Sequence, residues 1–242
     1  MSLKLTAAHQ TTMGLRVRND DCVGMMMPVE PALSAKGMIG IVADGVSGSA
    51  GGGEAAKLAV RSLLKDYYAA PDSNVTEALD TVLCAINHQI YERGAAFAER
   101  GGMATTLTAL VLRDHAYYFS HVGDTRLYRL RNDTFEQLTT DHVADSSAKK
   151  HLLTRAMGLD ARVMIDHGTG ELETGDIFLL ATDGVWAVVP EHELSWHVSE
   201  LVDDKRSAEG TAQLLIDAAL AAGSTDNVSV LVVRIDQLPT IL

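Results

Sequence analysis

The sequence predicts an α+β fold in which two antiparallel β-sheets pack face to face with helices outside each, a four-layer αββα sandwich. The expected strands come in runs joined by short turns, whereas the helices fall into separate blocks, a pattern typical of α+β folds. Several expected strands are apolar on both faces, as residues 177–181 and 228–233 show, and such strands need cover on both sides. The 242 residues contain no repeat or obvious linker, so we expect a single domain over 1–242.

The first half of the chain contains one predicted buried strand and two predicted helices. Residues 36–43 are apolar and β-branched and end at Asp44, which indicates a strand that stops at a turn. A stretch rich in glycine and serine follows. A helix is then predicted over 54–68 and a second over 75–98, because both segments carry apolar residues at helical spacing.

The second half is predicted to be mostly strands. Short turns of Asp-His and Asn-Asp indicate two hairpins. A proline in the first turn and a glycine after the last turn mark helix ends. In order, we expect a hairpin of strands 106–113 and 116–122, a hairpin of strands 125–131 and 135–138, a loop with a helical turn over 141–155, a strand over 177–182, a helix starting at Pro190, a helix over 207–222 and a strand over 227–235.

The composition argues against several classes of protein. The formal net charge is −12, and so acidic a surface repels phosphate backbones, so nucleic acid is not an expected partner. The two cysteines, Cys22 and Cys84, show neither metal-binding spacing nor a disulfide framework. No apolar run reaches the roughly 18–20 residues needed to cross a bilayer, and the N-terminus has no signal-peptide core. We expect a cytoplasmic protein with no membrane partner.

Three aspartates stand at the ends of expected buried strands. Asp44 follows Ile-Gly-Ile-Val-Ala, Asp183 follows Phe-Leu-Leu-Ala-Thr, and Asp226 precedes Asn-Val-Ser-Val-Leu-Val-Val. A carboxylate beside a core is costly unless it is paired or binds a metal. A shared divalent cation would also offset the repulsion between the three, and hard oxygen ligands suit Mg²⁺ or Mn²⁺. Taken singly, an Asp-Gly pair is more simply an ordinary turn signal.

Seven short motifs then occur in order along nearly the whole chain. They are Arg16–Asp21, Val42–Gly45 with Gly53–Ala56, Met103–Thr106, His121–Arg126, Leu153–Gly158, Ala181–Trp186 and Thr225–Val230. One Asp-Gly pair is weak evidence, but seven motifs in this order are specific. Through them the sequence resembles the protein phosphatase 2C family of metal-dependent phosphatases, in its compact bacterial form.

The resemblance implies a serine/threonine phosphoprotein phosphatase with two Mn²⁺ or Mg²⁺ ions in its site. Two cations about 4 Å apart can share one water, lower its pKa and present hydroxide in line with the phosphorus. No covalent phosphoenzyme is needed, so no nucleophilic cysteine is expected. The implied partners are phosphorylated proteins, among them a bacterial serine/threonine kinase and its substrates, and a monomer is expected.

The resemblance also implies roles for individual residues. Arg16, Asp44 and Asp183 would be catalytic, with Arg16 as a bidentate clamp on the substrate phosphate. Asp44 would bridge the two ions, and Asp20 and Asp21 would help to hold the ions, directly or through waters. The implied metal-binding set is Asp20, Asp21, Asp44, the carbonyl of Gly45, Asp124, Asp183 and Asp226, in which Asp124 would complete a weaker third site.

The sequence departs from the family pattern in the loop after Asp44. Residues 46–52 are one residue longer than usual and lack the histidine that the family carries there. The general acid for the leaving hydroxyl is therefore unassigned, with His142 or a metal-bound water as the candidates. Arg18 is an alternative to Arg16 as the phosphate ligand.

Two rival functions are weighed against this one. A phosphatase with an aspartyl nucleophile needs a second aspartate two residues after the first, and Val46 occupies that place. A catalytically weak or inactive relative that binds phosphoproteins as a regulatory module would be expected to have lost a metal aspartate, whereas Asp44, Asp183 and Asp226 are all present.

Overall fold

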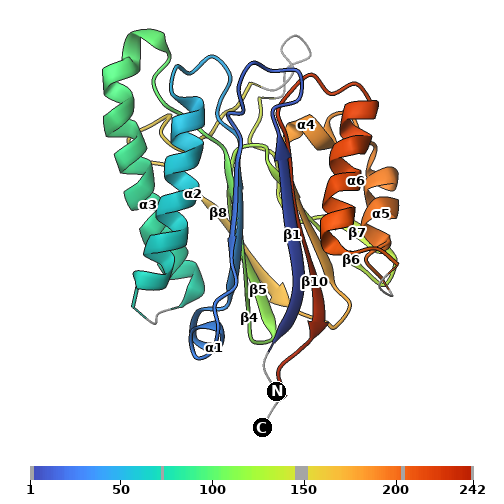
Figure 1. Ribbon diagram of the computed structural model, residues 1–242. Helices are drawn as coiled ribbons and strands as arrows, with labels where there is room; N and C mark the ends of the chain where they lie inside the picture. The colour runs from blue at the N-terminus through green and yellow to red at the C-terminus, as the bar shows by residue number, and fades with distance from the viewer. Residues whose placement is uncertain (1–2, 72–73, 145–151, 203–204, 241–242) are drawn as a thin grey trace.

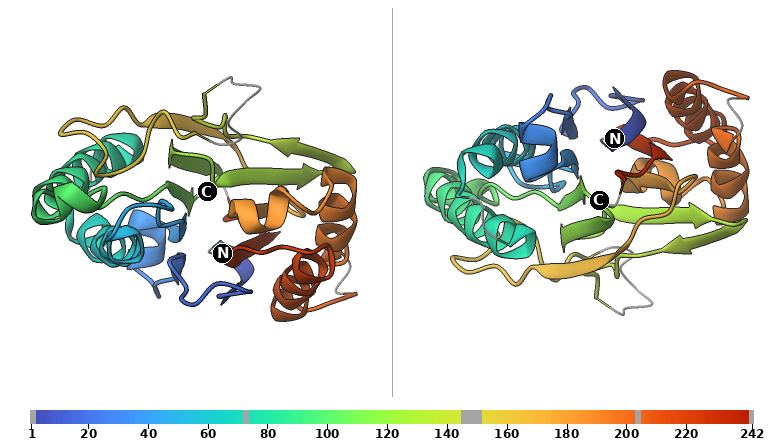
Figure 2. Two further views of the ribbon diagram at one scale, coloured as in Figure 1. Left: turned by 90° about the horizontal axis from the view of Figure 1, so that it is seen from above. Right: turned by 90° about the horizontal axis from the view of Figure 1, so that it is seen from below.

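The structure is a computed structural model that describes residues 3–71, 74–144, 152–202 and 205–240. It confirms the predicted sandwich: two five-stranded antiparallel sheets face each other, and helices cover the outer face of each (Figure 1). Seen along the strands, the helix, sheet, sheet and helix layers follow one another across the molecule (Figure 2).

The two sheets are built from strands that lie far apart in the sequence. The first sheet has the order β1 (Lys4–Thr12), β10 (Val228–Gln237), β9 (Ile177–Ala181), β6 (Arg126–Arg131) and β7 (Thr134–Gln137). The second sheet has the order β2 (Cys22–Met26), β3 (Met38–Ala43), β4 (Leu107–Arg113), β5 (Ala116–Val122) and β8 (Asp166–Glu171).

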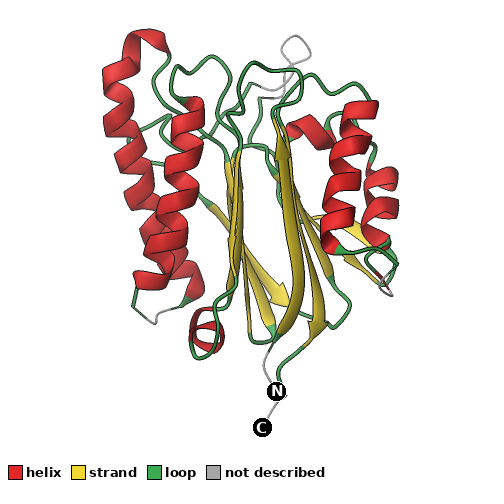
Figure 3. Cartoon of the chain, in the orientation of Figure 1, coloured by secondary structure: helices red, strands yellow, loops and turns green. Residues whose placement is uncertain are grey.

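Helices lie outside both sheets (Figure 3). Asn74 caps one of them by accepting a hydrogen bond from the backbone N–H of Thr76 at 2.9 Å, and Ser207 caps another by accepting from Gly210 at 3.1 Å. The second sheet is covered by α2 (Gly52–Ala69) and α3 (Val75–Gly94), the first by α4 (Asp183–Trp186), α5 (Glu191–Ser199) and α6 (Ala208–Ala221), and the short α1 (Ala32–Lys36) precedes β3.

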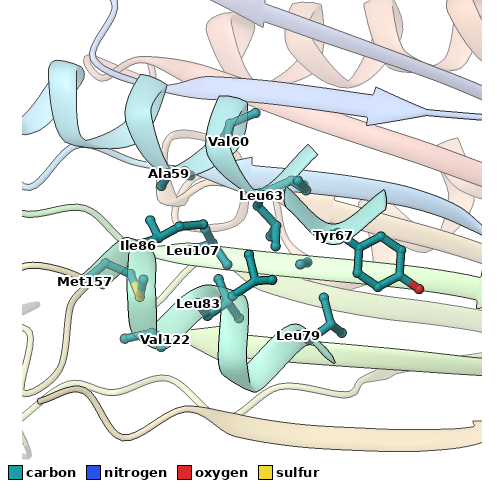
Figure 4. Close-up of a cluster of buried hydrophobic side chains, with 14 of the residues drawn as sticks. Ala59, Val60, Leu63, Tyr67, Leu79, Leu83, Ile86, Leu107, Val122 and Met157 are labelled. Carbon is teal, nitrogen blue, oxygen red and sulfur yellow. The ribbon is translucent and has the colours of Figure 1, made fainter. Parts of the chain in front are cut away.

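Three apolar cores separate the four layers. Figure 4 shows the core under α2 and α3, where Leu63, Leu83 and Ile86 lie next to Leu107 of β4. A second core lies under α4 to α6, and a third lies between the sheets. Alternation along β3 explains why this strand is apolar throughout: Ile39 and Ile41 face the helices, whereas residues 38 and 42 face the other sheet.

Some boundaries differ from the sequence prediction. The helix expected over 75–98 ends at Gly94 and continues as a 3₁₀ helix, Ala95–Arg100. In the loop expected over 141–155, a bridge joins Val143 to Leu153, and residues 145–151 lie outside the described part of the chain. The sequence did not predict β1, β2, β8 or α1.

The topology gathers one set of strand ends at one edge of the sandwich. Because neighbouring strands are antiparallel, the ends of β3, β5 and β9 lie at the same edge as the beginnings of β2 and β10. This is the upper edge in Figure 1, opposite the chain termini. The aspartates singled out from the sequence lie at this edge, Asp183 as the first residue of α4 and the others in loops.

Candidate active site

Asp44 lies at the centre of the acidic cluster. Burial raises the pKa of its carboxyl group well above the usual range, and the charges of Asp21, Asp183, Asp124 and Asp226 raise it further. All four carboxylates are therefore close enough to interact with Asp44, which agrees with the convergence that the sequence predicts. Thr106, the residue before β4, holds the backbone of Asp44. The Asp44 N–H donates to Thr106 Oγ1 at 2.9 Å, and the Asp44 carbonyl accepts from the Thr106 N–H at 2.8 Å.

Asp21 lies beneath this cluster with 5% of its surface exposed. Its Oδ2 atom accepts hydrogen bonds from Ser229 Oγ at 2.6 Å and from Thr182 Oγ1 at 3.1 Å. Burial raises its pKa to about 7 although these two bonds oppose the shift. Within the described ranges, its Oδ1 atom has no hydrogen-bond partner. A buried acceptor of this kind fits a cation nearby.

Asp124 lies in the loop between β5 and β6 and is 4% exposed. Burial raises the pKa of its carboxyl group to about 7, with further contributions from the charges of Asp183 and Asp141. Asp183, which follows β9, faces the same pocket as Asp124. These two aspartates come from different sheets, so the cluster spans the junction between the sheets.

Two arginines are paired with the acidic residues at the rim. Arg16 Nη2 lies 2.6 Å from Asp226 Oδ2, and Arg18 Nε lies 2.7 Å from Asp20 Oδ2. Both side chains remain substantially exposed, so each guanidinium has further N–H groups directed to solvent. Both arginines line the same pocket, so the structure keeps Arg16 and its alternative Arg18 at the site.

Asn227 braces the loop that carries both arginines. Its side-chain carbonyl accepts from the backbone N–H of Asp20 at 2.8 Å, and its Nδ2 donates to the carbonyls of Met13 at 3.0 Å and Arg18 at 2.9 Å. The sequence analysis missed this role. The position next to Asp226 at a strand start was the available signal, but the partners lie more than 200 residues away.

Close backbone packing explains the glycine after Asp44. A Cβ atom on Gly45 would lie 2.4 Å from the carbonyl carbon of Gly52, at the start of α2. The Gly45 N–H donates to the carbonyl of Asp20 at 3.2 Å. The loops that follow β1 and β3 are thereby tied together at the site.

Two adjoining pockets open at this edge, and Asp44, Val46, Ser47 and Asp226 line both. The first, of ≈ 300 Å³, is also lined by Arg16, Arg18, Asp20, Gly45, Gly48, Ser49 and Asn227. The second, of ≈ 320 Å³, is also lined by Asp124, Asp183, Thr106 and the apolar residues Leu152, Leu153, Ala156 and Leu159. Every residue that the sequence analysis assigned to the site lines one of these pockets except Asp21, which is buried below them.

The donor set fits a hard divalent cation. It consists of carboxylate oxygens and backbone carbonyls, and its buried carboxylates raise one another's pKa. In the described part of the chain, no three His, Cys, Asp or Glu side chains already stand in a ligand arrangement. The carboxylates of Asp226 and Asp20 are directed to the guanidinium groups of Arg16 and Arg18.

The structure argues against His142 as the general acid. This side chain is 6% exposed and lines neither pocket. Its Nδ1 lies 3.1 Å from the Gly123 N–H nitrogen, and its Nε2 lies 3.0 Å from Asp166 Oδ2. Both ring nitrogens are thus engaged away from the place where a substrate would sit.

Comparison with known proteins decides the family. The family model described as protein phosphatase 2C matches residues 28–221. The chain belongs to the protein phosphatase 2C family. Its relatives include the serine/threonine phosphatase stp of Listeria innocua, 33% identical over 214 residues that cover 80% of this chain and 83% of the relative. The protein phosphatase PhpP of Streptococcus pneumoniae is 27% identical over 215 residues, covering 81% and 85%.

Solved structures of protein phosphatase 2C relatives share the fold. The catalytic domain of the serine/threonine protein phosphatase PstP, in complex with two manganese ions, has a TM-score of 0.82 and 27% identity and covers 98% of this chain and 100% of that one. The phosphatase Stp1 from Staphylococcus aureus has a TM-score of 0.84 at 25% identity, with 98% of each chain covered. No described helix of this protein phosphatase 2C chain is long and apolar enough to span a membrane.

Proposed function

We propose that this protein phosphatase 2C chain hydrolyses phosphoserine and phosphothreonine in proteins and that divalent cations bind in its aspartate cluster. The observation that carries the proposal is the gathering of Asp21, Asp124, Asp183 and Asp226 around the half-buried Asp44, with Arg16 at the rim. Like charges crowded in a desolvated site are costly unless cations offset them. The relatives named as serine/threonine phosphatases support the same activity.

The lining of the two pockets supports a proposed set of metal-holding residues. Asp44 lines both pockets, which suits a carboxylate that bridges two ions. Asp183 and Asp226 would hold one ion, and the Gly45 carbonyl the other. Asp20 and Asp21 would help directly or through waters, and Asp124 would complete a weaker third site. Bound Mn²⁺ or Mg²⁺ would supply an activated water for attack on phosphorus and would offset charge on the phosphoryl oxygens.

Arg16 would bind and orient the substrate phosphate. Its guanidinium lies at the mouth of the first pocket, held there by Asp226 at 2.6 Å. A planar guanidinium can donate two parallel hydrogen bonds to a phosphate. The chain carries a formal net charge of −12, so local positive charge at this rim is needed to attract an anionic substrate. Arg18, paired with Asp20, would take second place in the same role.

The cellular setting belongs to the same proposal. A phosphatase of this family most simply opposes a bacterial serine/threonine kinase and acts on phosphorylated proteins, among them that kinase and its substrates. We place the enzyme in the cytoplasm as a monomer, with one domain over 1–242 carrying the whole site. The named activities of the Listeria and Streptococcus relatives support the substrate class.

An assay with matched variants tests the activity. Hydrolysis of p-nitrophenyl phosphate and of a phosphothreonine peptide would be measured with Mn²⁺, with Mg²⁺ and with EDTA. We expect turnover with either metal, none with EDTA, and a loss of at least about 100-fold for Asp183→Asn, because that variant removes a charged oxygen ligand. Asp217→Asn, on the exposed face of α6, is the control and should retain wild-type activity.

Failure of the assay would favour the regulatory-module alternative. A folded wild-type protein that shows no turnover with any metal, yet binds the phosphothreonine peptide, would contradict the enzyme and indicate a phosphoprotein-binding role. Turnover that persists in EDTA and in Asp183→Asn would contradict the metal-dependent mechanism instead.

A further inference from the structure

His142 is a buried side chain outside the two pockets, both of its ring nitrogens have hydrogen-bond partners, and the proposed reaction makes no use of it. It contacts the turn before Asp124 through two hydrogen bonds. The His142 N–H donates to the Gly123 carbonyl at 2.7 Å, and the Gly123 N–H donates to His142 Nδ1 at 3.1 Å. One residue thus binds both polar groups of the Gly123 peptide backbone.

These contacts define the protonation state of the ring. A backbone N–H can only donate, so Nδ1 must accept and carries no proton. The proton of the neutral ring then lies on Nε2, which donates to Asp166 Oδ2 at 3.0 Å, and Arg155 Nη1 also lies 3.3 Å from Nε2. The other oxygen of Asp166 accepts from Arg155 Nη1 at 2.8 Å. A carboxylate that fixes a histidine tautomer in this way also fixes the orientation of the ring.

The turn that His142 contacts requires glycine at position 123. Gly123 has a φ of +111°, and a Cβ atom there would lie 2.6 Å from Thr106. Asp124 follows directly and carries a buried carboxylate that faces the second pocket. Repulsion from Asp183 and Asp141 acts to displace that carboxylate.

We propose that His142 is a positioning residue that holds the Gly123–Asp124 turn so that the Asp124 carboxylate faces the second pocket for cation binding. The inference rests on the proposed function, because Asp124 is a ligand only in that proposal. Asp166 and Arg155 act one step further out by fixing the tautomer and orientation of the imidazole. No proton moves through His142 in this role.

Two substitutions of His142 test the contacts of its two ring nitrogens separately. Asn at position 142 places an amide oxygen close to the position of Nδ1, so it can still accept from the Gly123 N–H but does not reach Asp166. Gln reaches toward the position of Nε2, so it can still donate to Asp166 but offers Gly123 no acceptor. We expect His142→Gln to weaken Mn²⁺ binding at the weakest site about 10-fold and His142→Asn to stay closer to wild type.

Amide exchange and Mn²⁺ titration provide the readouts, and neither requires turnover. In EDTA, exchange of the Gly123 amide should be faster in His142→Gln than in wild type and in His142→Asn. Calorimetric Mn²⁺ titrations should show the matching order of affinities. In an Asp124→Asn background, His142→Gln should have no further effect on Mn²⁺ binding, because the two residues act through one site.

Several outcomes would overturn the proposal. They are an unchanged Gly123 amide and Mn²⁺ isotherm in His142→Gln, equal losses in the Gln and Asn variants, or an affinity loss that persists in the Asp124→Asn background. If His142→Gln does not fold, Asp166→Asn replaces it: a weaker Mn²⁺ site and faster Gly123 exchange are expected, and wild-type behaviour in both would overturn the proposal. An inactive wild type would contradict the proposed function while leaving these binding results interpretable.

Discussion

Burial shifts the pKa values of the site aspartates and of a buried histidine in opposite directions. Loss of water disfavours the charged form of each group, so the pKa values of Asp44, Asp21 and Asp124 rise, whereas that of His121 falls to about 4. His121 is accommodated as a neutral ring, with Thr108 Oγ1 2.9 Å from Nδ1 and the Thr140 carbonyl 3.1 Å from Nε2. The same edge of the protein therefore contains aspartates that stabilise the fold as the pH falls and a histidine that destabilises it.

His121 should make the protein less stable in acid. The unfolded chain binds a proton at about pH 6.5 but the folded protein only at about pH 4, so the stabilisation is present above pH 6.5 and is lost as the pH falls to 4. The full effect is about 3 kcal/mol in the free energy of unfolding. In urea denaturation in EDTA, lowering the pH from 7.5 to 4.5 should change the free energy of unfolding less favourably in wild type than in His121→Asn, because both proteins contain the aspartates with raised pKa values but only wild type contains His121. Equal pH effects in the two proteins would contradict this assignment.

Single residues of the site were predictable to different degrees. Asp44, Asp183 and Asp226 could be predicted because each adjoins an end of an apolar strand, where an acidic residue has no role in packing, whereas Asp20, Asp21 and Asp124 were predicted only through the family resemblance. The pairing of Arg16 with Asp226 could not, because 210 positions separate the partners. The contacts of His142 were hidden for the same reason, and the sequence analysis considered a general-acid role that its burial does not support.

The segment just before His142 also ties two structural elements together. Arg126 at the start of β6 donates to Asp141 through Nε at 3.0 Å and Nη2 at 2.7 Å. Its guanidinium lies over the ring of Trp186, 3.6 Å from the centroid, and Trp186 ends the short helix that Asp183 begins. Residues 141 and 142 thus contact the surroundings of both Asp183 and Asp124.

Arg126→Lys should destabilise this region although the charge is kept. Lysine cannot form the two-pronged contact with Asp141 or stack flat on Trp186, so we expect a loss of about 1–3 kcal/mol in the free energy of unfolding. Urea denaturation measures it. Arg113→Lys is the control, because the Arg113 pair with Asp114 is long, at 3.5 Å, and more exposed, and its loss should cost under about 0.5 kcal/mol. Equal effects of the two substitutions would show that the fork and the stacking contribute nothing.

At the level of elements, the interior strands were predictable and three edge strands, β1, β2 and β8, were not. Both β3 and β9 are buried on both faces, so their residues are apolar throughout and distinctive in the sequence. In contrast, β1 and β8 lie at sheet edges and are largely polar, with one face open to solvent. Their membership in a sheet depends on a partner strand that local sequence does not reveal. The hairpin of β6 and β7 was found because its turn is local.

The cluster of aspartates joins the two halves of the whole molecule. Asp44 follows a strand of the second sheet, Asp183 and Asp226 adjoin strands of the first, and Asp21 and Asp124 lie in loops that connect the two sheets. The sheets otherwise meet through apolar contacts, such as the Leu231 side chain against Gly40. A cation bound at the cluster would therefore connect both sheets as well as serve the reaction.

Mn²⁺ should accordingly stabilise the whole fold. At a free Mn²⁺ concentration 100 times the dissociation constant, the free energy of unfolding should rise by about 2.7 kcal/mol relative to EDTA. Thermal unfolding of wild type, Asp183→Asn and Asp217→Asn in Mn²⁺ and in EDTA checks this. We expect the shift to shrink in Asp183→Asn and to persist in Asp217→Asn. A shift of equal size in all three would place the Mn²⁺ elsewhere.

The pairing of β1 with β10 has a consequence for synthesis of the protein. The N-terminal strand has its partner at the opposite end of the chain, in a register that runs from Lys4 with Gln237 to Thr12 with Val228. The second sheet needs nothing beyond Glu171, so it can form while the chain is still attached to the ribosome. The first sheet must wait for its last strand, and Asp226 emerges only just before it. The nascent chain therefore completes its aspartate cluster only after Asp226 and β10 have been synthesised.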